Sequence, residues 1–87
     1  MRSNGKEEVP PWLSALARSV RAQRKALGLT QREVSELAGC GPVFIYDLEH
    51  GEKPTLRLDK LLDVLAVLGL RLTLEPGKDR LRVEVPP

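Results

Sequence analysis

Cysteine and histidine are scarce in this sequence. Its 87 residues include one cysteine, Cys40, and one histidine, His50. A single cysteine excludes a disulfide within the chain, and one residue of each type excludes a Cys/His metal site of ordinary ligand number. These two residues and the scattered carboxylates form no nucleophile–base arrangement, and no glycine-rich phosphate loop is present. We therefore expect no metal, no cofactor and no enzymatic activity.

Long apolar runs are also lacking. No segment approaches the roughly 18 consecutive apolar residues of a membrane-spanning helix. The opening sequence MRSNGKEEVPP has no apolar core of the kind found in signal peptides. We expect a cytoplasmic protein with no membrane partner.

The net charge is small, because 14 Lys and Arg residues face 12 Asp and Glu residues, giving +2. Bulk charge therefore does not identify a nucleic-acid binder. The basic residues are nevertheless concentrated between residues 18 and 32, at Arg18, Arg21, Arg24, Lys25 and Arg32. This distribution predicts a local cationic face, although an ordinary solvated surface explains Arg18 and Arg21 equally well.

The length allows one small domain. A monomer of this size buries only about 60 to 65% of the surface of its unfolded chain, so a partner chain is the expected source of further stability. Residues 1–10 are polar, lack periodicity and end at a proline pair, which predicts a flexible tail. Residues 11–69 are expected to form the folded domain, and residues 70–87 a separate C-terminal element.

Apolar residues at helical spacing predict two longer helices, over residues 12–27 and 58–68. A glycine follows each of them, as expected where a helix stops. The side chains expected to face inward are Leu13, Leu16, Ala17, Val20 and Leu27 in the first helix and Leu58, Leu61, Leu62, Leu65 and Leu68 in the second.

Two shorter helices are expected between them. Thr30-Gln31-Arg32-Glu33 has the form of a capping box and begins one of them, which ends at Gly39. Gly41-Pro42 then begins the next, because proline suits the first helical position, and this helix runs to about residue 50. Their inward-facing residues are expected to be Val34, Leu37, Ala38, Ile45 and Leu48, with Phe44 beside them.

The spacing of apolar residues changes from helical to alternating after residue 69. Every second residue is apolar in residues 70–75 and again in residues 80–85, on either side of Pro76-Gly77-Lys78-Asp79. This pattern predicts two half-buried strands joined by a turn. The expected fold is therefore mainly α, with four to five helices and a C-terminal β-strand or hairpin.

Two short helices joined by a glycine-containing turn form a helix-turn-helix. The small residue Ser35 lies where the helices should cross, and Ile45 and Leu48 should hold the second helix on the first. With LGLTQREVSELAG before the turn and IYDLEHGEKP after it, residues 20–68 resemble the Cro/cI-type (XRE) helix-turn-helix family of bacterial DNA-binding regulators. The alternative is a small helical bundle in which Gly39 merely ends a helix.

The C-terminal part of the chain is similar to one branch of this family. The run PTLRLDKLLDVLAVLGLRLTLEPG resembles the HipB-like antitoxins of HipBA-type toxin–antitoxin pairs. The resemblance implies a homodimeric, nucleoid-associated repressor of its own operon that binds a pseudo-palindromic operator in double-stranded DNA and also binds a HipA-like kinase. It implies that the C-terminal strands pair between subunits, with Leu70, Leu72, Leu74, Leu81, Val83 and Val85 at the dimer interface.

The family register also implies which residues meet DNA. It places Pro42, Val43, Tyr46 and Asp47 against base edges, where many relatives carry residues able to form bidentate contacts. Direct reading should therefore be weak: Val43 can touch a thymine methyl, Tyr46 can donate one hydrogen bond, and Asp47 can accept from a cytosine amino group or act only as a solvated acid.

Contacts to the DNA backbone are expected from the starts of two helices and from one loop. The first-turn amides after Thr30 and the side chain of Gln31 can bind a phosphate, because a helix N-terminus carries unpaired N–H groups. The amides near Gly41 can do the same, and His50 and Lys53 lie in a loop that relatives place on the backbone, although His50 can equally be a solvent-exposed loop residue.

Four further residues are interpreted as structural. The family pattern pairs Arg24 with Glu49, which should brace the fold near the phosphates. Cys40 lies where relatives place an apolar residue between the helices, so we expect a buried thiol. Trp12 is expected to anchor the first helix. The alternative to DNA reading is a protein-interaction module that holds a HipA-like kinase and has lost sequence preference.

Overall fold

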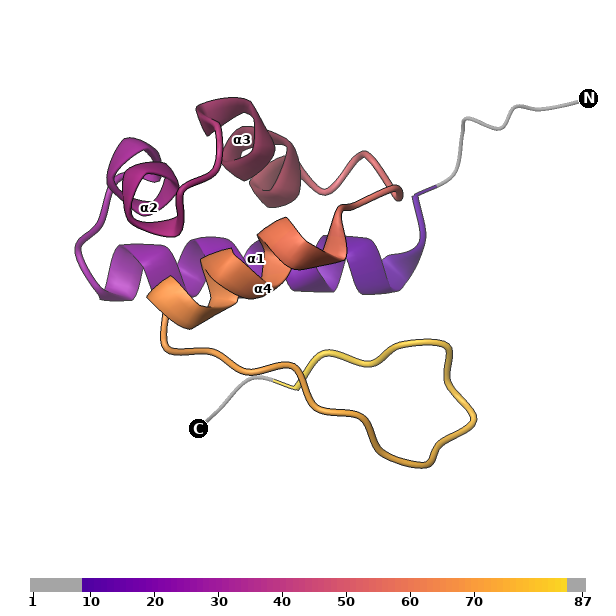
Figure 1. The fold of residues 1–87 in the computed structure, drawn as a ribbon. Helices are drawn as coiled ribbons and strands as arrows, with labels where there is room; N and C mark the ends of the chain where they lie inside the picture. Colours follow the sequence, from indigo (N-terminus) through magenta and orange to yellow (C-terminus); the bar gives the residue numbers. More distant parts are fainter. Residues whose placement is uncertain (1–8, 85–87) are drawn as a thin grey trace, which may run out of the picture.

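The computed structural model describes residues 9–84. This part of the chain contains four helices, α1 (Pro11–Ala26), α2 (Gln31–Ala38), α3 (Pro42–His50) and α4 (Leu58–Val67). Figure 1 shows α2 and α3 together on one side of α1, α4 crossing in front of α1, and the residues after α4 forming a wide loop. The prediction of a mainly helical fold is confirmed, with four helices. Most of the predicted N-terminal tail lies outside the described residues.

Local sequence signals set the helix ends. Proline occupies the first position of both α1 and α3, where its missing N–H costs no hydrogen bond. The short helices α2 and α3 each end at a glycine with positive φ, Gly39 at 71° and Gly51 at 64°. A left-handed residue at this position is the common way to end a helix, and glycine adopts it without strain.

Each helix contributes to one apolar core. Contacts join α1 to α3, α3 to α2 and α2 to α4. The buried apolar residues are Leu13, Ala17 and Val20 of α1, Val34 of α2, Ile45 and Leu48 of α3, and Leu61, Val64, Leu65 and Leu68 from α4 and its C-terminal cap. Ser35 is buried as well, which agrees with its expected place where the helices cross.

Four leucines expected in the core lie at the surface instead: Leu27, Leu37, Leu58 and Leu62. Leu37 is the clearest case, with 66% of its surface exposed. The reason is that α2 is short and buries only Val34 and Ser35 between its neighbours. In α4 the buried stripe passes through Val64, which turns Leu58 and Leu62 outward.

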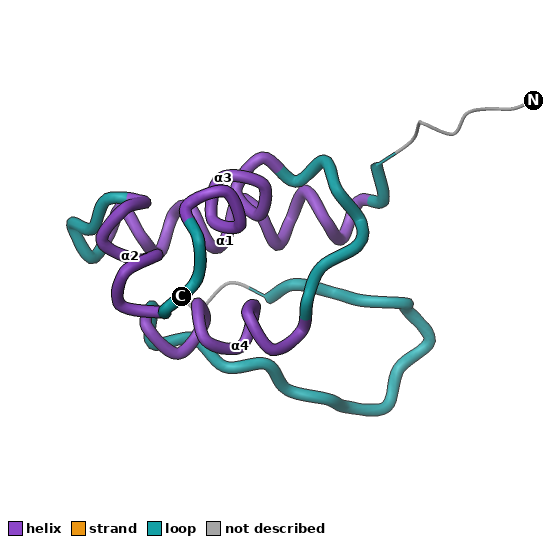
Figure 2. Tube along the Cα trace, turned by 45° about the horizontal axis from the view of Figure 1, so that its top comes forward, coloured by secondary structure: helices purple, strands orange, loops and turns teal. Residues whose placement is uncertain are grey.

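The predicted C-terminal strands are wrong for the described chain. Residues 70–84 form no strand, and Figure 2 draws them as loop throughout. A two-stranded hairpin without a further strand or helix to pack against is marginal in water. The last backbone bond into the helical body is from Leu70 N to Leu65 O, at 2.8 Å, so the segment leaves the body directly after α4.

Candidate nucleic-acid interface

Helix α2 begins with reciprocal hydrogen bonds, and a glycine-containing turn follows it and leads into α3. At the start of α2, Glu33 N donates to Thr30 Oγ1 at 3.0 Å and Thr30 N donates to Glu33 Oε1 at 2.8 Å. The predicted capping box is therefore confirmed. At the other end, Cys40 N donates to Ser35 O at 3.0 Å, which closes the turn before Gly41 and Pro42 begin α3.

One buried carboxylate joins three helices. Glu49 of α3 accepts from Arg24 of α1 through two bonds, Nε to Oε2 at 2.6 Å and Nη2 to Oε1 at 2.9 Å. Gln31, the first residue of α2, donates Nε2 to Glu49 Oε1 at 3.0 Å. The Glu49 side chain is only 2% exposed and that of Arg24 11%. The pair implied by the family pattern is thus present, and it also fixes the Gln31 amide.

The charges of this network support one another. Burial by itself raises the pKa of Glu49, but the hydrogen bonds from Arg24 and Gln31 and the nearby positive charge outweigh burial and lower its pKa below the ordinary value. The hydrogen bond to Glu49 likewise raises the pKa of Arg24. Both groups are therefore charged at neutral pH, and the ion pair clamps α3 against α1.

The outer side of α3 carries a continuous exposed face. Val43, Tyr46, Asp47 and His50 lie at positions i, i+3, i+4 and i+7 of the helix, which places them on one side. Val43 is 68% exposed and Tyr46 52%. The opposite side is buried through Ile45 and Leu48. We call these four outward residues the α3 outer face.

Contacts within the α3 outer face order its side chains. The rings of Tyr46 and His50 stack with centroids 3.8 Å apart and planes inclined by 26°. His50 Nδ1 lies 2.8 Å from Tyr46 O, so this ring nitrogen carries the proton that the carbonyl accepts. Lys53 Nζ donates to Asp47 Oδ2 at 3.0 Å. The face therefore presents ordered groups.

The structure brings together most of the residues expected to meet DNA. Val43, Tyr46 and Asp47 share the α3 outer face, and Gln31 is tied to the same helix through Glu49. The Thr30 hydroxyl accepts from Glu33 N in the capping box. The group expected to meet a phosphate at the start of α2 is therefore the set of first-turn amides, not this hydroxyl. Sequence reasoning missed the Gln31–Glu49 bond and the Tyr46–His50 stack; the four-residue spacing of the stacked pair was the available signal.

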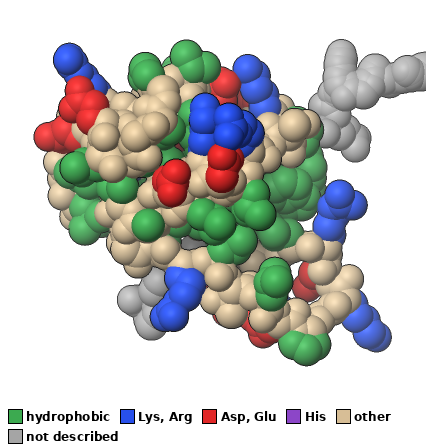
Figure 3. Space-filling model, viewed as in Figure 1, with side chains coloured by type: hydrophobic (Ala, Val, Ile, Leu, Met, Phe, Trp, Pro, Cys, Tyr) green, Lys and Arg blue, Asp and Glu red, His purple; other side chains and the backbone are tan. Residues whose placement is uncertain are grey.

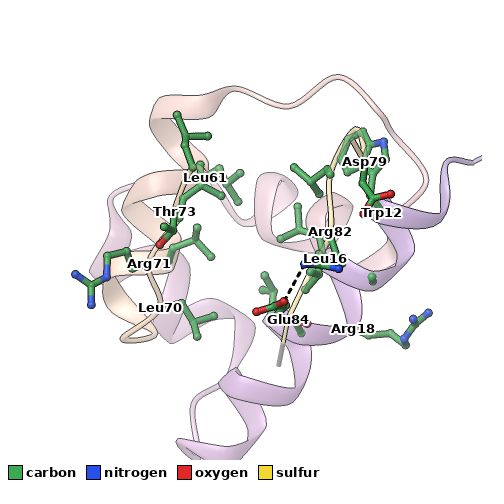
Figure 4. Close-up of a pocket in the computed structure, with 18 of the residues that line it drawn as sticks. Trp12, Leu16, Arg18, Leu61, Leu70, Arg71, Thr73, Asp79, Arg82 and Glu84 are labelled. Carbon is green, nitrogen blue, oxygen red and sulfur yellow. Dashed lines mark ion pairs between the residues drawn. The ribbon is translucent and has the colours of Figure 1, made fainter. Parts of the chain in front are cut away.

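Two of the residues interpreted as structural, Cys40 and Trp12, are only partly buried. Cys40 packs against the core but keeps some exposure, and burial raises the pKa of its thiol. Trp12 is half-buried, and its indole Nε1 is enclosed without a hydrogen-bond partner among the described residues. Trp12 lies near the start of α1 and faces the loop formed by residues 70–84 (Figure 4).

A groove of about 1090 Å³ separates this loop from α1 and α4. Its helical wall includes Trp12, Leu16, Leu61 and Leu65. Figure 3 shows apolar side chains along the hollow between the helical body and the loop. The residues proposed for a dimer interface lie in the loop: Leu70 packs on the core, while Leu72, Leu74 and Leu81 are exposed and Val83 is half-buried. Val85 lies outside the described residues.

Between residues 9 and 84, no cluster of three or more His, Cys, Asp or Glu side chains has an arrangement that could hold a metal ion. None of the helices described above is both long enough and apolar enough to cross a membrane.

Comparison with known proteins identifies the family. A family model described as "Helix-turn-helix" matches residues 20–74. The chain belongs to this helix-turn-helix family. An uncharacterized HTH-type transcriptional regulator of Sinorhizobium fredii, y4mF, is 43% identical over 74 residues, which cover 84% of this chain and 92% of the relative. The helix-turn-helix predicted from the sequence is confirmed, and the family is one of DNA-binding transcriptional regulators.

Solved structures show the same helix-turn-helix fold. The clp gene regulator ClgR from Corynebacterium glutamicum superposes with a TM-score of 0.62 and 30% identity, over 72% of this chain and 66% of that chain. A chain of the HipA-HipB-O2-O3 complex superposes with a TM-score of 0.67 and 24% identity, over 83% of this chain and 99% of that chain. Because only 24% of the residues are identical, the similarity to the HipA-HipB-O2-O3 chain shows a shared fold and nothing further.

Proposed function

We propose that this protein is a sequence-specific transcriptional repressor that binds a pseudo-palindromic operator as a homodimer. The observation that supports this most is the α3 outer face, an ordered and exposed surface on the second helix of a helix-turn-helix. In helix-turn-helix proteins this helix enters the major groove. Repression then follows from occupancy, because a bound dimer blocks access to the promoter DNA.

Base reading falls to three side chains of α3. Val43 is placed to touch a thymine methyl, Tyr46 to donate its hydroxyl hydrogen, and Asp47 to accept from a cytosine amino group. Pro42, at the first position of the helix, lies at the groove edge. None of these makes a bidentate contact of the arginine–guanine kind, so sequence-dependent DNA shape contributes a larger share of the specificity.

Backbone contacts position the helix. The first-turn amides of α2 and the Gln31 side chain, braced by Glu49, bind one phosphate. The amides that follow Gly41 bind a second phosphate. His50 and Lys53 contact the backbone of the same DNA strand. The Arg24–Glu49 pair holds α1 against α3, and Gln31 joins α2 to it, in the relative positions that these contacts require. Arg24 and Glu49 are buried with each other and do not themselves bind phosphate.

Dimerisation is assigned to the segment after α4. This segment makes no backbone pairing of its own among residues 71–84 and exposes alternating apolar side chains such as Leu72 and Leu74. The same segment of a second copy would give this backbone a pairing partner and would bury its apolar side chains. A two-fold dimer then presents two α3 helices about 34 Å apart, one turn of DNA.

We further propose that the repressor is the antitoxin of a toxin–antitoxin pair. It is supported by the similarity of residues 54–77 to HipB-like antitoxins and by the fold shared with a chain of the HipA-HipB-O2-O3 complex. In this role the protein represses its own operon at the nucleoid and holds a HipA-like kinase. A kinase-like reading frame adjacent to its gene, and co-purification of that kinase with this protein, are the expected findings.

A second candidate function is a protein-interaction module without sequence preference. The exposed apolar residues of α3, Val43 above all, favour it, because an apolar surface suits a protein partner. In that case the α3 outer face would contact protein instead of DNA.

Titration of two duplexes separates the candidates. One duplex carries the DNA upstream of the protein's own gene and the other a random sequence of equal length, at a fixed salt concentration. A repressor binds the upstream duplex at least 1,000-fold more tightly, the lower end of the usual specificity range. Equal affinity for the two duplexes would exclude the repressor and favour the interaction module.

A further inference from the structure

An ion pair occupies the middle of the α3 outer face. Lys53 Nζ lies 3.0 Å from Asp47 Oδ2. The lysine comes from the loop after α3 and its side chain is 66% exposed, whereas that of Asp47 is 24% exposed. The ammonium group thus lies at the surface, and the carboxylate is partly buried.

The surface proposed to approach DNA contains a carboxylate. The other acidic residue of α3, Glu49, is buried with Arg24, so Asp47 supplies the only carboxylate of the α3 outer face. On a surface that approaches a polyanion, an unpaired carboxylate is repelled by phosphates. Lys53 offsets this repulsion by pairing with Asp47. While it does so, its positive charge is balanced by the carboxylate and attracts a phosphate less strongly.

We propose that Asp47 and Lys53 form a sequence-dependent latch, an inference that rests on the DNA binding of the proposed function. On DNA without a matching base, Lys53 stays on Asp47. Acidic side chains usually accept a hydrogen bond from the N4 amino group of cytosine. Where the major groove offers this amino group, it donates to Asp47 in place of Lys53. Lys53 is then released to a phosphate, so one correct base adds both a base contact and a backbone contact.

The latch has a distinct electrostatic signature. Each phosphate neutralised by a protein cation adds about 0.9 to the steepness of the log–log dependence of affinity on salt. The complex with the operator should therefore be steeper than the complex with random DNA by about 0.9 per subunit, beyond any difference due to other contacts. Simple phosphate contact by an unlatched Lys53 would add equally to both complexes.

Salt titrations of four proteins test the latch, using a duplex selected by the wild-type protein and a random duplex. In Asp47→Asn, Lys53 is free on every sequence, so the random-duplex slope should steepen by about 0.9 per subunit. Affinity for the random duplex should rise by about 1.5-fold to fivefold, the range of an exposed ion pair. Adding Lys53→Met to Asp47→Asn should abolish both gains. Asp59→Asn, which removes a carboxylate paired with Arg57 on α4, is the charge-matched control and should leave the slope difference between the two duplexes unchanged.

The outcomes are separable. An Asp47→Asn protein whose slope and affinity on random DNA equal those of the wild type would overturn the latch while leaving DNA binding intact. A gain of the same size in Asp59→Asn would assign the effect to net charge and would also overturn it. Failure of the wild-type protein to prefer any duplex would instead contradict the proposed function. Both Asp47 and Lys53 reach solvent, and thermal melts of each variant confirm that the fold is retained.

Discussion

The side-chain amide of Gln31 donates to the Glu49 carboxylate across 3.0 Å, joining the first residue of α2 to the last turn of α3. Because a carboxylate only accepts hydrogen bonds, the NH₂ group of the amide must face Glu49. The orientation of Gln31 is therefore set inside the protein before any DNA arrives, and one N–H remains for a phosphate. The same carboxylate holds Arg24, so the fold and the DNA contact proposed for Gln31 share one residue.

Replacing Glu49 by Ala should destabilise the fold by about 3 kcal/mol, because it leaves the Arg24 guanidinium buried without its partner. Urea unfolding of the variant measures the loss. Glu36→Ala is the matched control, since Glu36 pairs with Arg32 at the surface and its removal should cost no more than about 1 kcal/mol. Equal losses in the two variants would show that the Glu49 pair does not support the fold.

The same residue should give the protein an acid-sensitive stability. The pKa of Glu49 is lower in the folded protein than the ordinary value of about 4.3. Its charged form therefore stabilises the fold fully above that pH, and this contribution is lost as the pH falls through the folded pKa. Unfolding free energies measured from pH 6 to pH 3 should fall more steeply for the wild type than for Glu49→Gln. Parallel curves would contradict the assignment.

Two glycines that end helices should respond differently to alanine. Both Gly39 and Gly51 have positive φ, which costs a non-glycine residue about 1 to 2 kcal/mol. At Gly39 an added Cβ meets nothing within 4 Å, but at Gly51 it would lie 2.9 Å from Ala17 Cβ and 3.3 Å from Leu13 O. Gly51→Ala should therefore lose about 1 to 3 kcal/mol more than Gly39→Ala. Thermal unfolding compares them, and a Gly39→Ala loss as large as that of Gly51→Ala would refute the close approach of α3 to α1.

Gln31→Ala should weaken binding to operator and random DNA alike, by about tenfold, as expected for one hydrogen bond to a charged group. The salt dependence should change little, because Gln31 carries no charge. Gln23→Ala is the control, since the Gln23 amide instead bonds to Leu68 O inside the fold. A change in which operator variants are preferred would place Gln31 against bases, contrary to the proposal.

Removing the chain after Leu70 should abolish dimerisation. This truncation keeps Leu70, which packs on the core, but removes the exposed apolar residues Leu72, Leu74 and Leu81. Without the dimer, two weak recognition helices no longer act on one DNA molecule, and operator affinity should fall by roughly 100-fold or more. Sedimentation beside an operator titration measures both. A truncated protein that remains dimeric and holds its operator would place the interface elsewhere.

The sequence was a good guide where structure is decided by neighbours in the chain. The capping box at Thr30 and the proline at the start of α3 act within three or four residues, so both helix ends could be predicted. It was a poorer guide where the outcome depends on distant packing. Apolar spacing alone does not distinguish the buried Val34 from the exposed Leu37, because their environment is set by α3 and α4.

The C-terminal segment shows the same limit in another form. Alternation at Leu70, Leu72 and Leu74 indicates residues able to form a strand, but a strand also needs a neighbour for its backbone. The described chain contains no such neighbour, and the segment remains loop. At the site, the bond from Gln31 to Glu49 spans 18 residues and becomes visible only once the helices are packed.

Selection of DNA from a randomised duplex library tests most directly whether the α3 outer face reads sequence. Wild-type protein should enrich a pseudo-palindromic site with half-sites about one helical turn apart. Val43→Ala and Tyr46→Ala should enrich altered half-sites while keeping nearly the same affinity for random DNA, since neither side chain carries charge. Enrichment of the wild-type site by both variants, or of no site by the wild type, would contradict the assignment of the α3 outer face as the reader of bases.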